Sequence, residues 1–520
     1  MGDHMHLNRE KATIAYKQML KEEGAIEISV EFVKVMSTSN RWEDRFGALM
    51  ISQQMVENTQ GNEEFIGVFL FKHFASAFTD EESRVRNQVG HLFKAIIERD
   101  QAGFGVTHFD ALKVMLLKNI EDTFERSVEV DASGVLIKPD PDSGKTRHDA
   151  EGWKTLETSM RILQNIIEGI GTRLYMFDLE PILKVILRSV NHLNRFVREI
   201  SYLVTNAIFQ TSAGILQKNE TEEDKEIIVR FKDFCEKLVL VVSQGLGDNW
   251  SQVRYAASLC SRSLYSVISS DEALLAKYNP SLVPRMCLNR YYVAEGVRVY
   301  SIETWRLTFG EKGRQTVCDY ADQICQYYIS QSEADNHAVR EAACHCISEL
   351  CTKVCSEEAP KEVFRPHIDA LLTALLDCFK DESWPVRDAA CVACGFFVAT
   401  FPKESESMFA ELVEIWFAHL SDNIFSVRHH SAFALASIFK QAPMYQEILM
   451  ERFTSHISTN IMKAKTDQQA ASTKNSNLED KTTFGVAQPF DTQHDNKQMY
   501  SCGSLAPKLK RGGGCMDHGF

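Results

Sequence analysis

Apolar residues recur along this chain at helical spacing, in runs that each follow a short polar block. After Val339, five apolar residues follow at separations that alternate between three and one: Ala342, Ala343, Cys346, Ile347 and Leu350. The residues after Val386 repeat this spacing. Residues three and four positions apart lie on the same face of an α-helix, so each run forms one apolar stripe. The pattern therefore predicts a series of amphipathic helices, each beginning at a polar block.

Each block contains a polar, usually acidic residue followed a few positions later by Val-Arg or a close variant. Its arginine recurs along the chain at Arg45, Arg86, Arg198, Arg254, Arg298, Arg340, Arg387 and Arg428. Successive arginines are 41, 112, 56, 44, 42, 47 and 41 residues apart. The separation of 112 leaves room for two units and an insertion, and an amphipathic stretch over residues 153–167 is the predicted missing unit.

A second amphipathic helix precedes each block, as over residues 368–379 before Asp381. Two helices with one apolar face each cannot bury those faces alone, whereas stacking of successive pairs buries them. The block, with Trp or Pro just before Val-Arg and Ala-Ala after it, resembles the HEAT repeat over roughly residues 40–440. Importin-beta-like transport receptors and the scaffold subunit of a major protein phosphatase are built from such repeats, so the resemblance implies a protein-binding role. We predict an all-α fold, an α-solenoid of about eight to nine HEAT-like helix pairs that forms a superhelical rod over residues 1–462.

Three segments interrupt or end this pattern. Residues 129–150 are rich in proline and acidic residues and are predicted to form an exposed insert. Residues 218–226 are predicted to be an acidic linker, and residues 463–520 a disordered tail because their apolar periodicity is lost. Within that tail, residues 499–520 have the composition of a short docking segment. One hypothesis is that the natural family continues beyond Phe520 and that this chain is a shortened form.

Composition narrows the class of protein further. The 26 glycines and 12 prolines among 520 residues are too few for an all-β protein, which needs frequent turns. The formal net charge of −14 argues against a dedicated nucleic-acid binder and favours partner proteins with basic segments. The 14 cysteines fall mostly in apolar helical segments, the first residues are polar, and no apolar run is long enough to span a membrane. We therefore expect a cytoplasmic or nuclear protein, and its oligomeric state stays open.

The recurrent arginines have two interpretations. A row of arginines is a suitable surface for phosphates or acidic peptides. Alternatively, each arginine pairs with an aspartate at the head of its own or the next repeat, and we favour this role because each arginine follows an acidic residue. The predicted structural ladder consists of Asp248, Asp335, Asp381, Asp422, Arg86, Arg198, Arg254, Arg340, Arg387 and Arg428.

Cysteines and histidines suggest metal sites only weakly. Cys391 and Cys394 have the spacing of a zinc or redox pair, but no second pair follows at a fixed distance. Cys344 and Cys346 lie about 200° apart around a helix, so they cannot chelate one metal together. We interpret these cysteines as buried apolar residues and His430 as a core histidine.

The sequence offers no positive sign of catalysis. Asp140, Asp142 and Gly144 are similar to the start of a calcium loop, but the glutamate that such a loop needs is misplaced. No phosphate-binding loop, nucleophile elbow or zinc-protease motif occurs. We therefore predict a non-enzymatic protein with no cofactor and no metal.

Large aromatic residues recur in the turns between paired helices. Trp42, Trp250, Trp384 and Phe425 occupy equivalent places, and His337 takes the same place in another repeat. Such side chains either pack over the neighbouring turn or form an exposed strip that contacts a partner. Packing is the favoured interpretation, and partner contact is retained as the alternative.

Three binding functions follow from this pattern. The leading hypothesis is a scaffold or adaptor that holds other proteins on the concave or turn surface of the array. The alternatives are transport-receptor-like binding of cargo and binding of tubulin or another cytoskeletal protein. The resemblance to transport receptors implies a longer array than this chain contains. The turn aspartates argue against tubulin. The tubulin-binding HEAT domains that this chain resembles present basic turns to acidic tubulin, whereas the turns here are acidic.

Overall fold

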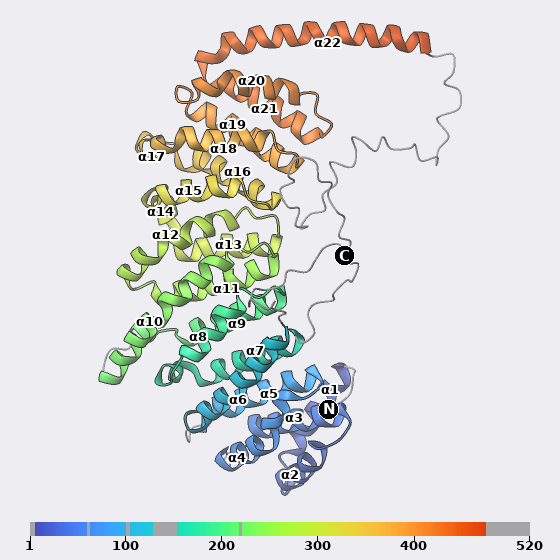
Figure 1. The fold of residues 1–520 in the computed structure, drawn as a ribbon, viewed down its shortest axis with the longest axis vertical. Helices are drawn as coiled ribbons and strands as arrows, with labels where there is room; N and C mark the ends of the chain where they lie inside the picture. The colour runs from blue at the N-terminus through green and yellow to red at the C-terminus, as the bar shows by residue number, and fades with distance from the viewer. Residues whose placement is uncertain (1–5, 60–62, 100–103, 128–152, 218–220, 475–520) are drawn as a thin grey trace, which may run out of the picture. The chain divides into compact units, whose positions relative to one another are not determined.

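The computed structural model describes the chain except for residues 1–5, 60–62, 100–103, 128–152, 218–220 and 475–520. Every regular element in the described ranges is a helix, so the all-α prediction is confirmed. The chain divides into two compact units, Met1–Tyr278 and Asn279–Phe520 (Figure 1). Among the described helices, none is long and apolar enough to cross a membrane.

The N-terminal unit is a stack of helix pairs. Its α-helices are α1 (His6–Met19), α2 (Ala25–Met36), α3 (Trp42–Asn58), α4 (Glu63–Phe74), α5 (Ser83–Arg99), α6 (Phe104–Ser127), α7 (Trp153–Ile170), α8 (Glu180–Ser189), α9 (Arg195–Thr211), α10 (Glu222–Gly245) and α11 (Ser251–Ile268). Three short 3₁₀ turns join them: η1 (Ala75–Thr79), η2 (Gly171–Met176) and η3 (Ile215–Gln217). The helix α12 (Glu272–Asn289) continues from this unit into the next.

The helices that begin at the Val-Arg blocks pack on one another in chain order. In the N-terminal unit α3 contacts α5, α5 contacts α7, α7 contacts α9 and α9 contacts α11 (Figure 1). Helix α7 is the unit that the long separation between arginines predicted. Small residues allow the helices to approach: a Cβ added to Gly169 would lie 3.1 Å from the carbonyl oxygen of Lys94 on α5.

The C-terminal unit repeats the same arrangement. Its α-helices are α13 (Glu295–Thr308), α14 (Gly313–Asp319), α15 (Ala321–Ser332), α16 (His337–Glu349), α17 (Glu358–Phe364), α18 (Ile368–Phe379), α19 (Trp384–Thr400), α20 (Glu406–His419), α21 (Phe425–Gln441) and α22 (Gln446–Lys474). The short turns are η4 (Gly310–Lys312), η5 (Leu350–Val354), η6 (Arg365–His367) and η7 (Pro443–Tyr445). Here α16 contacts α19, and α19 contacts α21.

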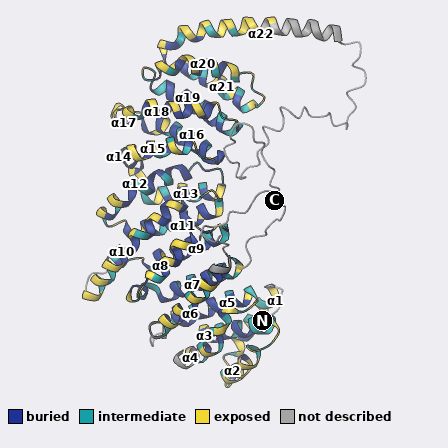
Figure 2. Cartoon of the chain, viewed as in Figure 1, coloured by how far each residue is buried: buried dark blue, intermediate teal, exposed yellow. Residues whose placement is uncertain are grey.

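The core of the C-terminal unit is apolar and rich in cysteine. It contains Cys346, Cys391 and Cys394 together with Leu375 and Trp416, all shielded from solvent. Figure 2 shows that the buried residues occupy the helix sides that face neighbouring helices. The apolar stripes of the sequence are therefore the packing faces of the stacked pairs, and the prediction of an α-solenoid of HEAT-like pairs is confirmed.

Two segments differ from the expected boundaries. Residues 222–226 of the stretch assigned to a linker over 218–226 instead form the start of α10, because Thr221 and Asp224 form a reciprocal capping box and the acidic first turn suits the positive end of the helix dipole. Helix α22 continues to Lys474, past the expected end of the repeats at residue 462. The insert over 129–150 and the docking segment over 499–520 lie outside the described residues.

Candidate functional site: the turns between paired helices

The turn aspartates fold the backbone of each turn. In each case a carboxylate oxygen accepts a hydrogen bond from the backbone N–H two residues later. The donor to Asp248 is Trp250 at 2.8 Å, and the donor to Asp381 is Ser383 at 2.8 Å. Asp422 accepts in the same way from Ile424 at 2.8 Å. Asparagine and aspartate side chains commonly close turns in this way, and here they set the start of the following helix.

One predicted aspartate has a different role. Here the side chain of Asn336, the N-cap of α16, accepts from the backbone N–H of Ala338 at 3.0 Å, and the side chain of Asp335 does not. Asp335 contributes its backbone carbonyl, which accepts from Arg340 at 3.0 Å. An acidic residue in the block therefore does not by itself identify the capping position.

The block arginines also bind the backbone of their own turns. Nη1 of Arg340 donates to the carbonyl of Ala334 at 2.8 Å, Nη1 of Arg387 to that of Asp381 at 2.9 Å, and Nη1 of Arg428 to that of Asp422 at 2.6 Å. Arg254 donates from Nε to the carbonyl of Asp248 at 2.9 Å. These carbonyls lie in the turn just after the preceding helix. Carbonyl groups near a helix end have no partner within the helix, so the arginine satisfies them.

The same arginines join one repeat to the next. Arg198 donates two hydrogen bonds to the carboxylate of Asp248, at 2.9 and 3.2 Å. Arg340 and Asp381 form the same two-pronged pair at 2.7 and 2.9 Å, with side chains only 6% and 9% exposed. Arg387 lies 3.5 Å from Asp422 in the next turn. Each guanidinium thus faces protein groups and not an open groove, which is the geometry of the structural ladder.

Arg86 differs from Arg198, Arg340 and Arg387 in its partner on the next repeat. Its Nε donates to the hydroxyl of Thr158 on α7 at 2.8 Å, and its Nη1 donates to the carbonyls of Asp80 and Glu81. Burial lowers the pKa of Arg86, and Asp80 and Glu82 act in the opposite direction.

Arg45 and Asp80 extend the ladder to the first repeats. Nε and Nη2 of Arg45 donate to the two carboxylate oxygens of Asp80, at 2.7 and 2.9 Å. Burial alone would raise the pKa of Asp80, but the hydrogen bonds from Arg45 and from the backbone of Glu82 outweigh it and hold the pKa below its ordinary value.

An ion pair that the sequence pattern does not reveal lies in the C-terminal unit. Arg290, at the end of α12, donates to both oxygens of Glu349 at 3.1 and 2.6 Å, and its guanidinium lies 4.6 Å from the ring of Trp305. Burial would raise the pKa of Glu349, but Arg290 and Lys353 hold it below its ordinary value. Arg290 does not follow a Val-Arg block, so only proximity in the fold identifies this pair.

The turn aromatics of the N-terminal unit contact neighbouring turns. The guanidinium of Arg84 lies 4.8 Å from the ring of Trp42. Arg195 lies between two rings, 4.8 Å from Phe196 and 4.3 Å from Trp250. Trp42 and Trp250 are half-buried, so part of each ring is covered by the protein and part is open to solvent.

The turn aromatics of the C-terminal unit differ from one another. Trp384 is half-buried and His337 is buried. Phe425 is 71% exposed, and its ring lies against two residues of its own helix, His429 and Arg428. Of the four predicted partner-contact residues, Phe425 is therefore the one whose side chain is open to solvent.

Of the candidate metal-binding residues, the two cysteines lie in the core, whereas His430, interpreted from the sequence as a core histidine, does not. Cys391 and Cys394 are fully buried, and burial raises the pKa of Cys391 to about 12, which opposes formation of the thiolate that binds metals. His430 is half-buried and its Nδ1 lies 2.7 Å from a carboxylate oxygen of Asp388 on α19. The described part of the chain holds no cluster of three or more metal-ligating side chains.

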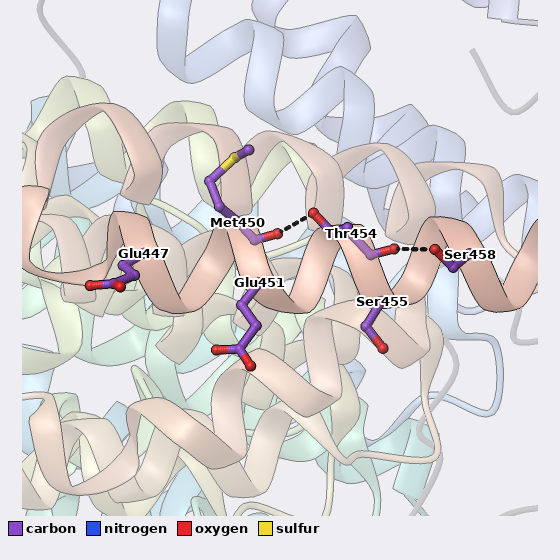
Figure 3. Close-up of a pocket in the computed structure, with 6 residues that line it drawn as sticks. All are labelled: Glu447, Met450, Glu451, Thr454, Ser455 and Ser458. Carbon is purple, nitrogen blue, oxygen red and sulfur yellow. Dashed lines mark hydrogen bonds between the residues drawn. The ribbon is translucent and has the colours of Figure 1, made fainter.

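A feature that the sequence did not indicate is the exposed apolar surface of the last two helices. On α21, Phe433 and Phe439 are exposed in addition to Phe425. On α22, three residues at helical spacing are exposed by 41–51%: Met450, Phe453 and Ile457. Beside them a depression is lined by Glu447, Met450, Glu451, Thr454, Ser455 and Ser458 (Figure 3). The amphipathic pattern predicted the helices but not which apolar side chains stay uncovered.

Fold and turn geometry together define a HEAT-like helical-repeat protein. Residues 206–432 match the model of a family described as dynein axonemal assembly factor 5-like, TPR repeats. A comparison with curated proteins finds none that matches the chain.

Several solved structures are similar to the chain. Yeast importin-beta (Kap95p) is 14% identical with a TM-score of 0.38, over 88% of this chain and 58% of that one. The karyopherin Kap121p, bound to the extreme C-terminus of the protein phosphatase Cdc14p, is 12% identical with a TM-score of 0.40, over 88% and 50%. An engineered protein is 12% identical with a TM-score of 0.31, over 84% and 96%. The chain thus spans 50–58% of the length of these two karyopherins.

Proposed function

We propose that this protein is a non-enzymatic scaffold or adaptor that binds partner proteins through the exposed apolar side chains of α21 and α22. The observation that carries the proposal is the concentration of such side chains there: Phe425, Phe433, Phe439, Met450, Phe453 and Ile457. A contiguous apolar surface rimmed by polar residues is typical of a protein interaction site. The block arginines and aspartates bind one another and the backbone, so they are occupied in holding the repeats together.

Other observations agree with a binding role. Residues 206–432 match a family named for an axonemal dynein assembly factor, and assembly requires contact with other proteins. The buried cysteines, whose pKa values are raised by burial, suit a reducing compartment. We propose that the protein works in the cytoplasm or the nucleus.

Affinity purification of the full chain with quantitative mass spectrometry tests the proposal. We expect Phe433→Ser combined with Phe453→Ser to deplete a set of proteins that the unmodified chain recovers. Ile28→Ser combined with Val35→Ser is the matched control, because both residues are exposed apolar side chains of the N-terminal unit. If the two double variants recover the same proteins in the same amounts, the apolar surface of α21 and α22 is not the binding site.

A second candidate function is binding of an acidic protein such as tubulin by the turns of the N-terminal unit. The side chains of Arg41 and Arg84 are 72% and 59% exposed beside Trp42. Asp248, one of the turn aspartates that argued against tubulin, is taken up in an ion pair with Arg198, and Asp80 in one with Arg45. Microtubule co-sedimentation at low salt decides this candidate: Arg41→Glu combined with Arg84→Glu should reduce the bound fraction several-fold. Cargo binding of the transport-receptor type stays a prediction.

A further inference from the structure

The exposed face of α21 corresponds to a face that α19 uses for packing. On α19, Asp388 bonds to His430 at 2.7 Å and the sulfur of Cys391 lies 3.3 Å from the hydroxyl of Ser431. A Cβ added to Gly395 would lie 2.7 Å from the Cβ of Ala434. These three residues of α19 therefore form its contact face toward α21, and their small size lets the two helices approach closely.

The same positions of the next repeat are uncovered. Arg387 and Arg428 set the register between the two helices, 41 positions apart. In that register Asp388, Cys391 and Gly395 correspond to His429, Ala432 and Ala436, which are all exposed on α21. This face has the small residues of a helix-packing surface, so its geometry suits an α-helix as the occupant.

Helix α22 adds exposed apolar and charged side chains to the surface at the end of the C-terminal unit. Its inner side packs on α20, where Arg452 pairs with Glu414 at 2.7 Å and His456 lies against Phe417. Met450, Phe453 and Ile457 form a separate stripe that is exposed. Burial of side chains of this size against a partner is favourable because it removes apolar surface from water.

Two carboxylates lie next to this stripe. Glu447 and Glu451 line the depression around Met450 (Figure 3), and no ion pair or hydrogen bond of either side chain occurs with the residues that the structure describes. Like charges four positions apart on a helix repel each other and destabilise it. A partner with positive charge at this place would remove that repulsion.

We propose that the α21–α22 end surface binds an amphipathic α-helix of a partner protein, with an apolar face toward Phe433, Phe453 and Ile457 and with Lys or Arg next to Glu447 and Glu451. This inference rests on the proposed function and specifies the chemistry of the partner. The partner helix packs on α21 in the same way as α21 packs on α19.

The test uses the purified full chain and two synthetic helical peptides. Both have Leu and Ala on one face, and they carry either Lys or Glu at the flanking positions. We expect fluorescence anisotropy to show that the Lys peptide binds several-fold more tightly. Phe453→Ser combined with Ile457→Ser should weaken binding of the Lys peptide by about tenfold or more.

Charge reversal tests whether Glu447 and Glu451 select a positively charged helix. Glu447→Lys combined with Glu451→Lys should make the Glu peptide the better ligand. The control, Glu22→Lys combined with Glu23→Lys, makes the same change in net charge at exposed residues of the N-terminal unit and should leave the preference unchanged. Thermal melting monitored by circular dichroism checks that each variant is folded.

Three outcomes would overturn the inference: equal binding of the two peptides, no binding of either, or a preference that charge reversal does not change. A wild-type dimer in light scattering that Phe453→Ser abolishes would identify a second copy as the occupant and would also overturn it. The proposed function can survive this failure. If cellular partners are lost with Phe433→Ser and Phe453→Ser but retained with Glu447→Lys and Glu451→Lys, the surface binds proteins but not through basic helices.

Discussion

Replacing Asp381 with Ala tests whether the ladder stabilises the stack of repeats. The carboxylate of Asp381 receives two hydrogen bonds from Arg340 and one from the backbone N–H of Ser383, and its side chain is 9% exposed. Asp381→Ala leaves the guanidinium of Arg340, which is 6% exposed, without its counter-ion. Breaking a buried ion pair by removal of one partner typically costs about 3–5 kcal/mol, most of it from the charge that stays behind.

Urea unfolding followed by circular dichroism measures this loss, and amide hydrogen exchange locates it. We expect the free energy of unfolding to fall by about 3–5 kcal/mol and exchange to accelerate first in α16 and α19, because neighbouring repeats depend on their shared interface. The matched control is Glu411→Ala, which removes a surface pair with Lys380 whose side chains are 53% and 47% exposed. Exposed pairs of this kind contribute about 1 kcal/mol or less.

A charge-neutral double variant separates charge from packing. Arg340→Met combined with Asp381→Leu leaves no charge in the site, so it should destabilise the unit less than Asp381→Ala alone. If Asp381→Ala costs no more than Glu411→Ala, the pair does not stabilise the stack and the structural role of the ladder is wrong.

Three further predictions concern helix packing, acid stability and thiol reactivity. Gly395→Ala should destabilise the C-terminal unit by about 1–3 kcal/mol in urea unfolding, because the new Cβ would meet Ala434 at 2.7 Å, whereas Gly296→Ala, with no atom within 4 Å, should be neutral or stabilising. Burial lowers the pKa of His192 to about 4 from 6.5, so only the unfolded chain takes up a proton between these values. Stability should therefore fall as pH drops from about 6.5 to about 4, and His192→Gln should flatten that dependence if the reasoning holds. In native iodoacetamide labelling read by mass spectrometry, half-buried Cys318 should react before fully buried Cys391, and the reverse order would contradict a core role for Cys391.

Local spacing in the sequence determined much of the fold. After Val339 and Val386, apolar residues follow at separations that alternate between three and one. This spacing specifies a helix with one apolar stripe, regardless of what packs against it. The recurrence of the block arginine set the register of the stack, including the repeat that α7 provides. The stripes depend on residues within one or two helical turns of each other, and the repeat depends only on spacing along the chain, so neither requires knowledge of distant contacts.

Pairings that fall outside the repeated pattern were decided by the tertiary structure alone. Arg290 and Glu349 are 59 positions apart and belong to no repeated pattern, so only the stacking of helices brings them together. The partner of Arg86 is the hydroxyl of Thr158, although the block pattern suggested a carboxylate.

Exposure was also decided by the tertiary structure. The sequence shows which residues are apolar, but a neighbouring helix determines whether such a side chain is covered. Phe397 of α19 is buried, whereas Phe433 and Phe453 on the last two helices stay open to solvent. The sequence thus specified the repeats and their ladder, while the tertiary structure decided which apolar surface is left for a partner, because burial depends on what packs against a helix as well as on its own residues.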